Sequence, residues 1–366
     1  MKDTHPITTH KLLTCNSNDL HDIKDSSVDL IVTSPPYPMI DMWDSIFISQ
    51  DNTIESDLSK GNGISAFKKM HEILNKTWAE CDRVLKNNGF VCVNIGDATR
   101  TIDGSFSLFS NHTEVINFFS EKGYSVLPDI HWRKQSNAPN KFMGSGMYPA
   151  GAYVTYEHEY ILIFRKGGKR AFNGSEKERR QRSAYFWEER NIWFSDLWEI
   201  KGTKQTIDSD KATRKRSASF PFEIPYRLVN MYSIEGDTVL DPFSGLGTTS
   251  LACIAAQRNS IGVDIDDSMI QIASNEIVKS KETLNKIIAD RLEKHKAFIN
   301  SLSNEKLDNC YLNGSHGFKV KTRQEIDIAI KRINKIYNDN GMIICDYGSE
   351  KDAEELNLFS LFDLNC

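Results

Sequence analysis

The sequence predicts an α/β fold built on a mostly parallel β-sheet, and three stretches support this prediction. Leu30–Val32 belongs to a short apolar run rich in β-branched residues, which is typical of a strand buried on both faces. Thr238–Thr249 is a second strand followed by an acidic residue and a glycine-rich turn, and Ser250–Ala256 has the composition of a helix. Ser260–Asp266 is a third short apolar strand that ends in a carboxylate. Open sheets of this kind carry their ligands at the carboxyl ends of the strands.

The first strand is expected at Lys11–Cys15, and the strand at Leu30 ends at two prolines. Pro35 and Pro36 cannot donate to a β-ladder, and each proline disfavours helix at the residue before it. The chain therefore leaves the sheet in a stiff, extended turn. An ordinary strand exit would contain the same two prolines, so this turn does not establish a site by itself.

The groups of this turn suit a planar base that carries an amino group. Ser34 contributes a hydroxyl, the backbone from Ser34 to Pro36 contributes carbonyl oxygens, and Tyr37 contributes a flat ring. The acceptors would hold the amino hydrogens while the ring stacks on the base. The nitrogen lone pair would then point at an electrophile.

Between this turn and residue 166 the sequence predicts helices and strands joined by polar loops. Ser49–Ser65 is expected to be a loop, either a lid over the site or a disordered insert. The apolar period of Ala66–Leu85 predicts a helix, and Gly89 is expected to follow its end. The other expected elements are a strand at Phe90–Ile95, a helix at Thr113–Glu121, a strand at Tyr124–Trp132, a loop at Arg133–Thr155 and a strand at Glu157–Lys166.

Basic and aromatic residues are interleaved in the interval 167–215, which lacks the pattern of a regular core. Residues 165–216 hold 15 Lys or Arg against 8 Asp or Glu, although the whole chain has a formal net charge of −5. A basic zone on an acidic body is typical of a polyanion-binding surface, and a solvated charged loop is the alternative. The aromatic rings fit stacking on bases, or packing onto the body as expected for Trp193 and Trp198. The expected DNA contacts are Arg179, Arg180, Arg182, Lys215 and Arg216.

The glycine turn after Thr238 has the general pattern of an adenosine-binding site. Gly245 and Gly247 allow the backbone to approach a ligand closely. A carboxylate follows each of the two strands here, Asp241 and Asp264, and the second is placed to accept hydrogen bonds from ribose hydroxyls. Glycine turns alone are weak evidence, whereas this turn combined with the Pro-Pro turn is a specific pattern.

Two of these stretches resemble the motifs of a known enzyme family. Thr33–Tyr37 (Thr-Ser-Pro-Pro-Tyr) is similar to the catalytic motif of DNA amino-methyltransferases, and Asp241–Thr249 (Asp-Pro-Phe-Ser-Gly-Leu-Gly-Thr-Thr) is similar to their S-adenosylmethionine motif. The catalytic motif comes first in the chain, as in the permuted β group of that family. The resemblance covers roughly residues 10–280 and implies a Rossmann-like sheet of the S-adenosylmethionine-dependent methyltransferase type.

The resemblance also implies which residues hold the cofactor. Lys215–Pro221 is similar to a segment of the family that touches the methionine end of the cofactor, although Arg216, Ser217 and Ser219 depart from its Lys-His-Pro-Ala-Pro-Phe-Pro pattern. The implied catalytic residues are Ser34, Pro35, Pro36 and Tyr37. The implied cofactor-binding residues are Asp241, Pro242, Phe243, Ser244, Gly245, Gly247, Thr248, Thr249, Asp264, Phe220 and Pro221.

These motifs divide the chain into four predicted segments. Residues 1–166 form the catalytic half of the methyltransferase domain, 167–215 a target-recognition segment, 216–280 the cofactor-binding half and 281–366 a mainly helical C-terminal extension. By analogy with the family, a short helix is expected within Asn16–Ser27. Later expected elements are helices at Glu223–Tyr232, from a cap at Ser268 to about Leu302 and at Gln324–Tyr337, an apolar run at Met342–Cys345 and an amphipathic tail at Ala353–Leu364.

Composition sets limits on the class of protein. No run of 18 apolar residues exists and the N-terminus lacks a signal pattern, so a cytoplasmic protein with no membrane contact is expected. The 7 cysteines are scattered without a Cys-x-x-Cys pair, which argues against disulfides and against a zinc site. No metal is therefore expected.

The resemblance implies direct methyl transfer from S-adenosylmethionine to an amino nitrogen of double-stranded DNA. The methyl donor carries its own activation, so the protein supplies orientation and proton acceptors. The base must be flipped out of the duplex, and Tyr37 would receive it. No cysteine follows a proline, which argues against the covalent route to 5-methylcytosine.

The residue before Pro-Pro indicates the target atom. In the family, Ser at this position usually accompanies cytosine N4 and Asp accompanies adenine N6, so Ser34 predicts N4-methylation of cytosine. Adenine presents the same pair of amino group and ring acceptor, and N6-methylation is the alternative. A DNA-binding module with a decayed cofactor fold and a nicotinamide-linked enzyme are alternatives of other classes. A cognate restriction endonuclease is an implied partner, while the recognition sequence and oligomeric state stay open.

Overall fold

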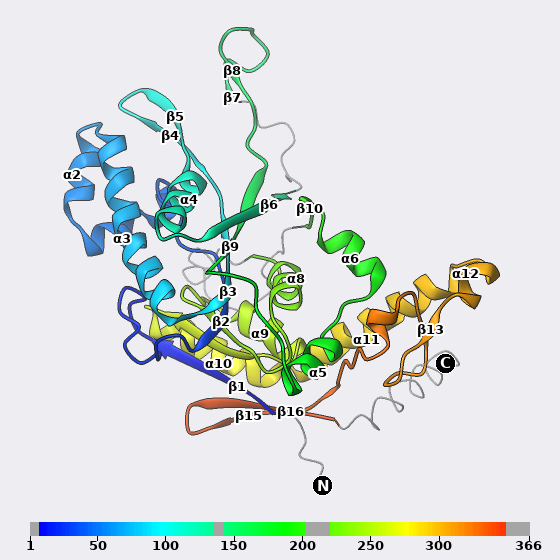
Figure 1. The fold of residues 1–366 in the computed structure, drawn as a ribbon. Helices are drawn as coiled ribbons and strands as arrows, with labels where there is room; N and C mark the ends of the chain where they lie inside the picture. The colour runs from blue at the N-terminus through cyan, green and yellow to red at the C-terminus, as the bar shows by residue number, and fades with distance from the viewer. Residues whose placement is uncertain (1–6, 135–142, 202–219, 349–366) are drawn as a thin grey trace.

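The computed structural model describes residues 7–134, 143–201 and 220–348, which build a ten-stranded sheet with helices on both faces (Figure 1). Its strands are β1 (Ile7–Thr14), β2 (Val28–Thr33), β3 (Leu85–Ile95), β6 (Ser125–Arg133), β9 (His158–Arg165), β10 (Leu197–Glu199), β11 (Thr238–Asp241), β12 (Asn259–Asp264), β15 (Ile333–Asp339) and β16 (Met342–Tyr347). Their order is β10-β6-β9-β3-β2-β11-β12-β1-β16-β15. The α/β prediction with a mostly parallel sheet is confirmed.

The strand directions bring the two predicted motifs together. The central strands β3, β2, β11, β12 and β1 are parallel neighbours. Among the described strands of this sheet, only β9 and β16 run against the rest, because each pairs antiparallel with both of its neighbours. Ser34 follows β2, Asp241 ends β11 and Asp264 ends β12, so all three lie at one edge, which we call the carboxyl edge.

Alternating side chains of the central strands enter two separate cores. Leu30 and Val32 belong to the core on one face, whereas Ile31 belongs to the core on the other face. The helices that contribute to the first core include α8 (Glu223–Tyr232), α9 (Thr248–Ala255), α10 (Asp267–Lys279) and α11 (Lys281–Asn300). The helices of the second core are α1 (Asp44–Gln50), α2 (Thr53–Ser59), α3 (Gly63–Val84) and α4 (Asn111–Glu121). Both faces are covered, which explains the almost continuous apolar strands.

The expected loop Ser49–Ser65 is largely helical, so the loop and the disordered insert are wrong, while a role as a lid stays a prediction. It contains the end of α1, all of α2 and the start of α3, and a short 3-10 turn at Asp41–Trp43 precedes it. Phe47 and Ile54 are 1% and 0% exposed, and their burial holds these short helices against α3. The expected short helix within Asn16–Ser27 is replaced by turns.

Gly89 lies inside a strand and does not end a helix as predicted. β3 begins at Leu85 directly after α3 and is irregular against β2 between Val28 and Leu30. A Cβ atom at Gly89 would lie 2.8 Å from the backbone oxygen of Asp29, closer than real Cβ contacts come. The strand contact therefore requires glycine, and the glycine does not mark a helix end.

Two hairpins rise from the carboxyl edge beside the Pro-Pro turn. β4 (Ala98–Ile102) and β5 (Ser105–Phe109) follow β3, and β7 (Met143–Gly144) and β8 (Ala152–Tyr153) follow β6. The second hairpin, expected as a loop, projects beyond the body (Figure 1). The rings of Phe106 and Tyr153 stack with centroids 4.7 Å apart, which joins the two hairpins.

The interval 167–215 contains regular elements that the sequence pattern did not indicate. They are α5 (Ser175–Arg182), α6 (Trp187–Trp193) and the edge strand β10, and residues 202–215 lie outside the described residues. Trp193 and Trp198 are buried, as predicted. The buried Arg291 of α11 forms an ion pair with Glu189 of α6 at 2.6 Å, which fastens this segment to the body.

The C-terminal extension combines helices with strands. α10 begins with Asp266 as its cap, whose side chain accepts from the Ser268 backbone, and the expected single helix is divided at Ser280 into α10 and α11. α12 (Asn304–Asp308), β13 (Tyr311–Leu312), β14 (Lys319–Val320) and a 3-10 turn (Arg323–Glu325) follow. The tail Ala353–Leu364 lies outside the described residues.

The expected helix at Gln324–Tyr337 is wrong, because its last residues, Ile333–Tyr337, belong to a β-hairpin and residues 326–332 are neither helix nor strand. β15 and β16 are joined at Asn340 and Gly341, whose φ angles are 51° and 86°. Asn-Gly is the preferred pair for such a turn, since both residues tolerate positive φ. β16 pairs with β1 and extends the central sheet.

Within the described ranges, none of the helices is long and apolar enough to cross a membrane.

Candidate active site

The Pro-Pro turn has the position that its sequence predicts. β2 ends at Thr33, Pro35 is buried, and Ser34 and Tyr37 are half-buried at the carboxyl edge. The Ser34 Oγ and the Tyr37 hydroxyl oxygen lie 3.1 Å apart. The turn therefore folds back on itself, so that its two hydroxyl groups share one hydrogen bond.

Two residues that the sequence analysis did not single out complete this cluster. Glu159 is the second residue of the strand β9 and Asn94 lies near the end of β3, and both side chains are buried. The Tyr37 hydroxyl donates to Glu159 Oε2 at 2.8 Å, and Asn94 Nδ2 donates to the same oxygen at 2.7 Å. Lys134 forms an ion pair with the other carboxylate oxygen of Glu159. A carboxylate at the start of an otherwise apolar strand was the signal that could have identified it.

The surroundings of Tyr37 keep its hydroxyl protonated. Burial and the neighbouring Glu159 carboxylate raise the pKa of Tyr37 well above its usual value of 10. A Cβ atom at Gly96 would lie 3.1 Å from the Tyr37 ring, so glycine provides room for the ring. The ring position is consequently defined by packing as well as by hydrogen bonds.

Asp241 links the two halves of the site through its carboxylate. Its Oδ1 accepts from the Thr33 hydroxyl at 2.6 Å and from the Phe243 backbone at 3.1 Å, and its Oδ2 accepts from the Thr249 hydroxyl at 2.6 Å. Burial raises the pKa of Asp241 to about 6, against the opposing effect of these donors. Asp241 thus joins the end of β2 to the glycine turn and to α9.

Asp264 fastens the glycine turn from the neighbouring strand. Its Oδ2 accepts from the Gly245 backbone at 2.9 Å and its Oδ1 from the Asp266 backbone at 2.9 Å. Burial raises its pKa. The next residue, Ile265, is 56% exposed and offers an apolar surface beside the carboxylate.

The turn itself leaves polar groups for a ligand. Gly245 and Gly247 have φ angles of 50° and 78°, which only glycine adopts readily. The Ser244 Oγ is buried and has no hydrogen-bond partner among the described residues. This hydroxyl faces Gly262 of β12, where a Cβ atom would lie 2.5 Å from it, whereas a Cβ atom at Gly245 would meet nothing within 4 Å. The turn therefore offers a ligand its open backbone at Gly245.

The remaining predicted cofactor residues frame this turn. Thr248 begins α9, and Pro242 is buried and its backbone oxygen accepts from the Ser17 hydroxyl. Phe220 and Pro221 are buried before α8. Lys215 and Arg216 lie outside the described residues.

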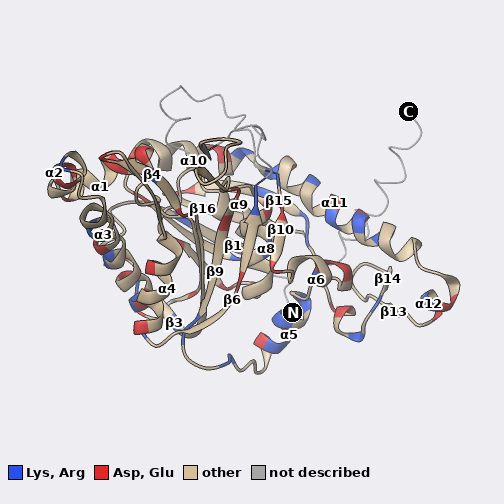
Figure 2. Cartoon of the chain, turned by 90° about the horizontal axis from the view of Figure 1, so that it is seen from above, with Lys and Arg blue, Asp and Glu red and all other residues tan. Residues whose placement is uncertain are grey.

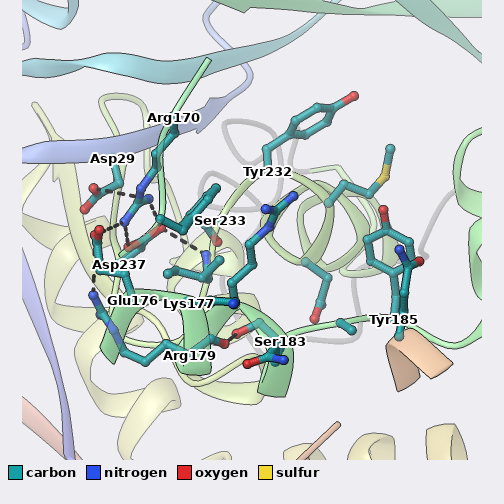
Figure 3. A pocket seen from close by; sticks show the side chains of 18 of the residues that line it. Asp29, Arg170, Glu176, Lys177, Arg179, Ser183, Tyr185, Tyr232, Ser233 and Asp237 are labelled. Atoms are coloured by element: carbon teal, nitrogen blue, oxygen red, sulfur yellow. Dashed lines mark hydrogen bonds and ion pairs between the residues drawn. The ribbon is translucent and has the colours of Figure 1, made fainter. Parts of the chain in front are cut away.

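The predicted DNA-contacting arginines of α5 lie away from the Pro-Pro turn. Arg179 and Arg180 line a cleft of about 1650 Å³ whose wall also includes Asp29 and Thr238, at the amino-terminal ends of β2 and β11 (Figure 3). The structure therefore does not bring α5 to the edge that carries Ser34. Figure 2 shows Lys and Arg on α5 and along α11.

Two of these three arginines have internal partners. Arg179 donates to the backbone oxygen of Glu235 at 2.9 Å, and Arg182 forms an ion pair with the Glu235 carboxylate at 2.7 Å. Arg180 lies over the Phe172 ring, 4.4 Å from its centroid, with no ion-pair partner in the described part of the chain. Arg179 and Arg182 are thus used for packing, whereas Arg180 contacts a ring.

No group of three His, Cys, Asp or Glu side chains in the described ranges could hold a metal ion.

The sheet, the glycine turn after β11 and the acidic residue at the end of β12 place this chain among proteins with a Rossmann-like fold. The chain matches the DNA methylase family over residues 28–275. The Type II methyltransferase M.MthZI of Methanothermobacter thermautotrophicus is 49% identical over 326 residues, covering 88% of this chain and 90% of that protein. M.MjaI of Methanocaldococcus jannaschii is 47% identical over 286 residues, covering 75% and 93%. This chain belongs to the DNA methylase family.

Solved structures agree with this family assignment. TTHA0409 of Thermus thermophilus, determined with S-adenosyl-L-methionine, has a TM-score of 0.58 and 26% identity, and covers 74% of this chain and 95% of its own. The cytosine-N4-specific PvuII DNA methyltransferase has a TM-score of 0.52 at 16% identity, covering 74% and 88%, which shows a shared fold.

Proposed function

We propose that this protein is a site-specific DNA methyltransferase that moves the methyl group of S-adenosylmethionine to the exocyclic N4 of a flipped cytosine in duplex DNA. The observation that carries this proposal is the position of the Ser-Pro-Pro-Tyr turn. Ser34 and the Pro35 carbonyl lie at the same sheet edge as the glycine turn and Asp264, and Asp241 bonds to both the strand before Ser34 and the glycine turn. An amino group on the first motif therefore meets a methyl donor held by the second.

The glycine turn fits S-adenosylmethionine as the cofactor. Asp264 would accept the ribose hydroxyls, Ile265 would cover the adenine, and the backbone of Phe243–Thr248 with Ser244 would enclose the methionine end. The open space beside Gly245 and the exposed side chain of Ile265 support this assignment. When bound, the cofactor supplies a methyl group that is already activated by its sulfonium.

The base-binding part of the site consists of Ser34, the Pro35 carbonyl and the Tyr37 ring. A base inside a duplex cannot reach this turn, so the target must be flipped. The hairpins β4–β5 and β7–β8 stand beside the turn and are the proposed walls around the extruded nucleotide. In the proposed target-recognition segment, residues 167–215, apolar side chains are exposed on α6 and β10 and between them: Trp187, Ile192, Phe194 and Leu197.

Cytosine is proposed as the target because of Ser34. In the family that the sequence resembles, Ser before Pro-Pro usually accompanies cytosine N4. Adenine N6 is the second candidate, because adenine also places an amino group beside a ring acceptor. The β-group order of the two motifs is part of the same proposal.

The names of the relatives suggest the biological setting. M.MthZI and M.MjaI are both Type II methyltransferases. We infer that this protein protects DNA at its own recognition site from a cognate restriction endonuclease. In this arrangement residues 1–166 and 216–280 supply the two halves of the methyltransferase domain, and residues 281–366 extend it.

The product nucleoside tests the proposal directly. Purified protein is incubated with S-adenosylmethionine and DNA, the DNA is digested to nucleosides, and the methylated nucleoside is identified by mass and retention time. N4-methylcytosine supports the proposal, and N6-methyladenine would transfer it to the second candidate. Cofactor binding without methylation of any DNA would instead indicate a DNA-binding module, and 5-methylcytosine would overturn the mechanism.

A further inference from the structure

A chain of hydrogen bonds leads from Ser34 into the protein, and its direction can be assigned. Glu159, paired with Lys134, is a carboxylate and only accepts hydrogen bonds. The single Tyr37 hydroxyl hydrogen is therefore donated to Glu159 Oε2 at 2.8 Å. The hydrogen bond between Ser34 and Tyr37, at 3.1 Å, must then be donated by Ser34.

Asn94 makes this direction hard to reverse. Its Nδ2 donates to Glu159 Oε2 at 2.7 Å, to the Tyr37 oxygen at 2.9 Å and to Ser34 Oγ at 3.4 Å, so its two hydrogens are shared among three acceptors of the chain. The Tyr37 oxygen consequently receives one bond from Asn94 and one from Ser34, which uses both of its lone pairs. The Ser34 hydrogen is thus directed inward, and the Ser34 Oγ lone pair that does not face Asn94 is left to accept from an amino hydrogen.

We propose that Glu159 is a positioning residue that, through Tyr37, makes Ser34 a pure hydrogen-bond acceptor toward the target amino group. A serine oriented in this way does what a carboxylate would do at the same position. It holds an amino hydrogen and leaves the nitrogen lone pair free to attack. This inference rests on the proposed function, because it requires an amino group at Ser34.

The same chain supplies a path for the proton that methylation releases. The nitrogen lone pair forms the N–CH3 bond while the electron pair of the C–S bond stays on sulfur, which leaves a positively charged amino nitrogen. Ser34 Oγ takes one proton from this nitrogen, the Ser34 proton passes to Tyr37, and the Tyr37 proton passes to Glu159. The products are a neutral methylamino base and a protonated Glu159, which returns its proton to solvent beside the half-exposed Lys134.

The direction in which Ser34 donates its hydrogen also affects the choice between cytosine and adenine. Because Ser34 donates inward, it has no hydrogen for the ring nitrogen next to the amino group, N3 of cytosine or N1 of adenine. The polarity of Ser34 therefore serves either base equally. Discrimination between the two must come from the size and shape of the remaining pocket, and not from donation by Ser34.

The decisive variants are Glu159→Gln and Tyr37→Phe, which change few atoms. An amide at position 159 can donate to Tyr37 and reverse the chain, and phenylalanine at position 37 interrupts it. The control Glu157→Gln makes the same chemical change two residues away, at a side chain that contacts Arg133 at 3.8 Å and lies outside the chain. Lys134→Met removes the ion pair but leaves the carboxylate as an acceptor.

The single-turnover methylation rate and the Kd values for S-adenosylmethionine and for a duplex are measured for each variant. We expect E159Q and Y37F each to lower the rate by about 100-fold or more, the scale of a positioned proton-transfer group, with both Kd values within about threefold of wild type. E157Q should keep the wild-type rate, and K134M should lose less than about tenfold. The rate of the double variant E159Q/Y37F should lie within about threefold of the rate of the slower single variant. Both substitutions interrupt the same chain of hydrogen bonds, so their effects should not multiply.

Three results would overturn the inference. E159Q could methylate at the wild-type rate, the two single effects could multiply in the double variant, or E159Q could lose rate only in proportion to lost binding. If E159Q does not fold, Y37F carries the same test, since a wild-type rate for Y37F also overturns the chain. Wild-type protein that methylates no DNA would instead be a failure of the proposed function, and the inference would fall with it.

Discussion

Replacing Asp264 by Ala tests the cofactor half of the site. In the proposed function the carboxylate accepts from two ribose hydroxyls, and in the structure its oxygens accept from the Gly245 and Asp266 backbones at 2.9 Å. Losing a pair of charge-assisted bonds costs about 2–4 kcal/mol. At about 1.4 kcal/mol per factor of ten, this corresponds to a loss of cofactor affinity by tens- to hundreds-fold.

The structure adds a second effect that the assay must separate. D264A also leaves two backbone N–H groups of the turn without their acceptor, so the turn loosens and the thermal midpoint falls. Asp264→Asn keeps one acceptor oxygen for the turn but removes the charge, and we expect it to lose affinity with a smaller loss of stability. Asp267→Asn is the matched control, because Asp267 contacts Thr14 at 2.8 Å and does not touch the turn.

Calorimetric titration with S-adenosylmethionine measures the affinity, and a duplex-binding assay runs in parallel. DNA affinity should stay nearly constant in D264A and D264N, since Asp264 lies in the cofactor half. Unchanged cofactor affinity in both variants would refute the assignment of Asp264. A loss of the same size in D267N would show that any charge near this turn has the same effect.

Two further predictions concern charge. Replacing Arg179, Arg180 and Arg182 together by Ala should lower the thermal midpoint, because two of the three have internal partners, and should reduce the salt-dependence slope of DNA binding by no more than about 0.9, the value for one phosphate contact. A slope change near three contacts would show that all three arginines touch DNA. Burial lowers the pKa of His10 to about 3, so below about pH 6.5 the unfolded chain binds a proton that the folded chain does not, and His10 contributes about 2 kcal/mol to the fall in stability between pH 7 and pH 5. Urea unfolding at both pH values should show a smaller fall for His10→Gln, and an equal fall would assign the effect to other groups.

Local sequence was sufficient for the elements whose signals are contained within a few residues. The apolar run of β2, the two prolines after it and the glycine turn before α9 each restrict the backbone through their own sterics. These are the elements that place Ser34, Asp241 and Asp264. Periodicity also identified α3 within a few residues of its observed ends, and the resemblance to the family identified α8.

Two predictions were wrong because the local sequence pattern fits more than one secondary structure. Gly89 was expected to end a helix, but its role is to let β3 approach the backbone of Asp29. The stretch around Ile336 has an apolar period that a helix also shows, yet Asn340-Gly341 turns it into a hairpin that pairs with β1. The Asn-Gly pair was visible in the sequence, whereas the strand it would join was not.

The sequence by itself determined the α/β class, the order of the two motifs and the residues at their centres, because each depends on short-range steric rules. Only the tertiary structure decided which side chains meet at the site. Glu159 and Asn94 lie 122 and 57 residues from Tyr37, and they reach it because β9, β3 and β2 are neighbours in the sheet. The arginines of α5 show the converse, since their pairing with Glu235 depends on the packing of α5 against the start of β11. The positions of charged residues in a sequence do not reveal which of them form ion pairs, because ion pairs depend on distances that exist only in the folded chain.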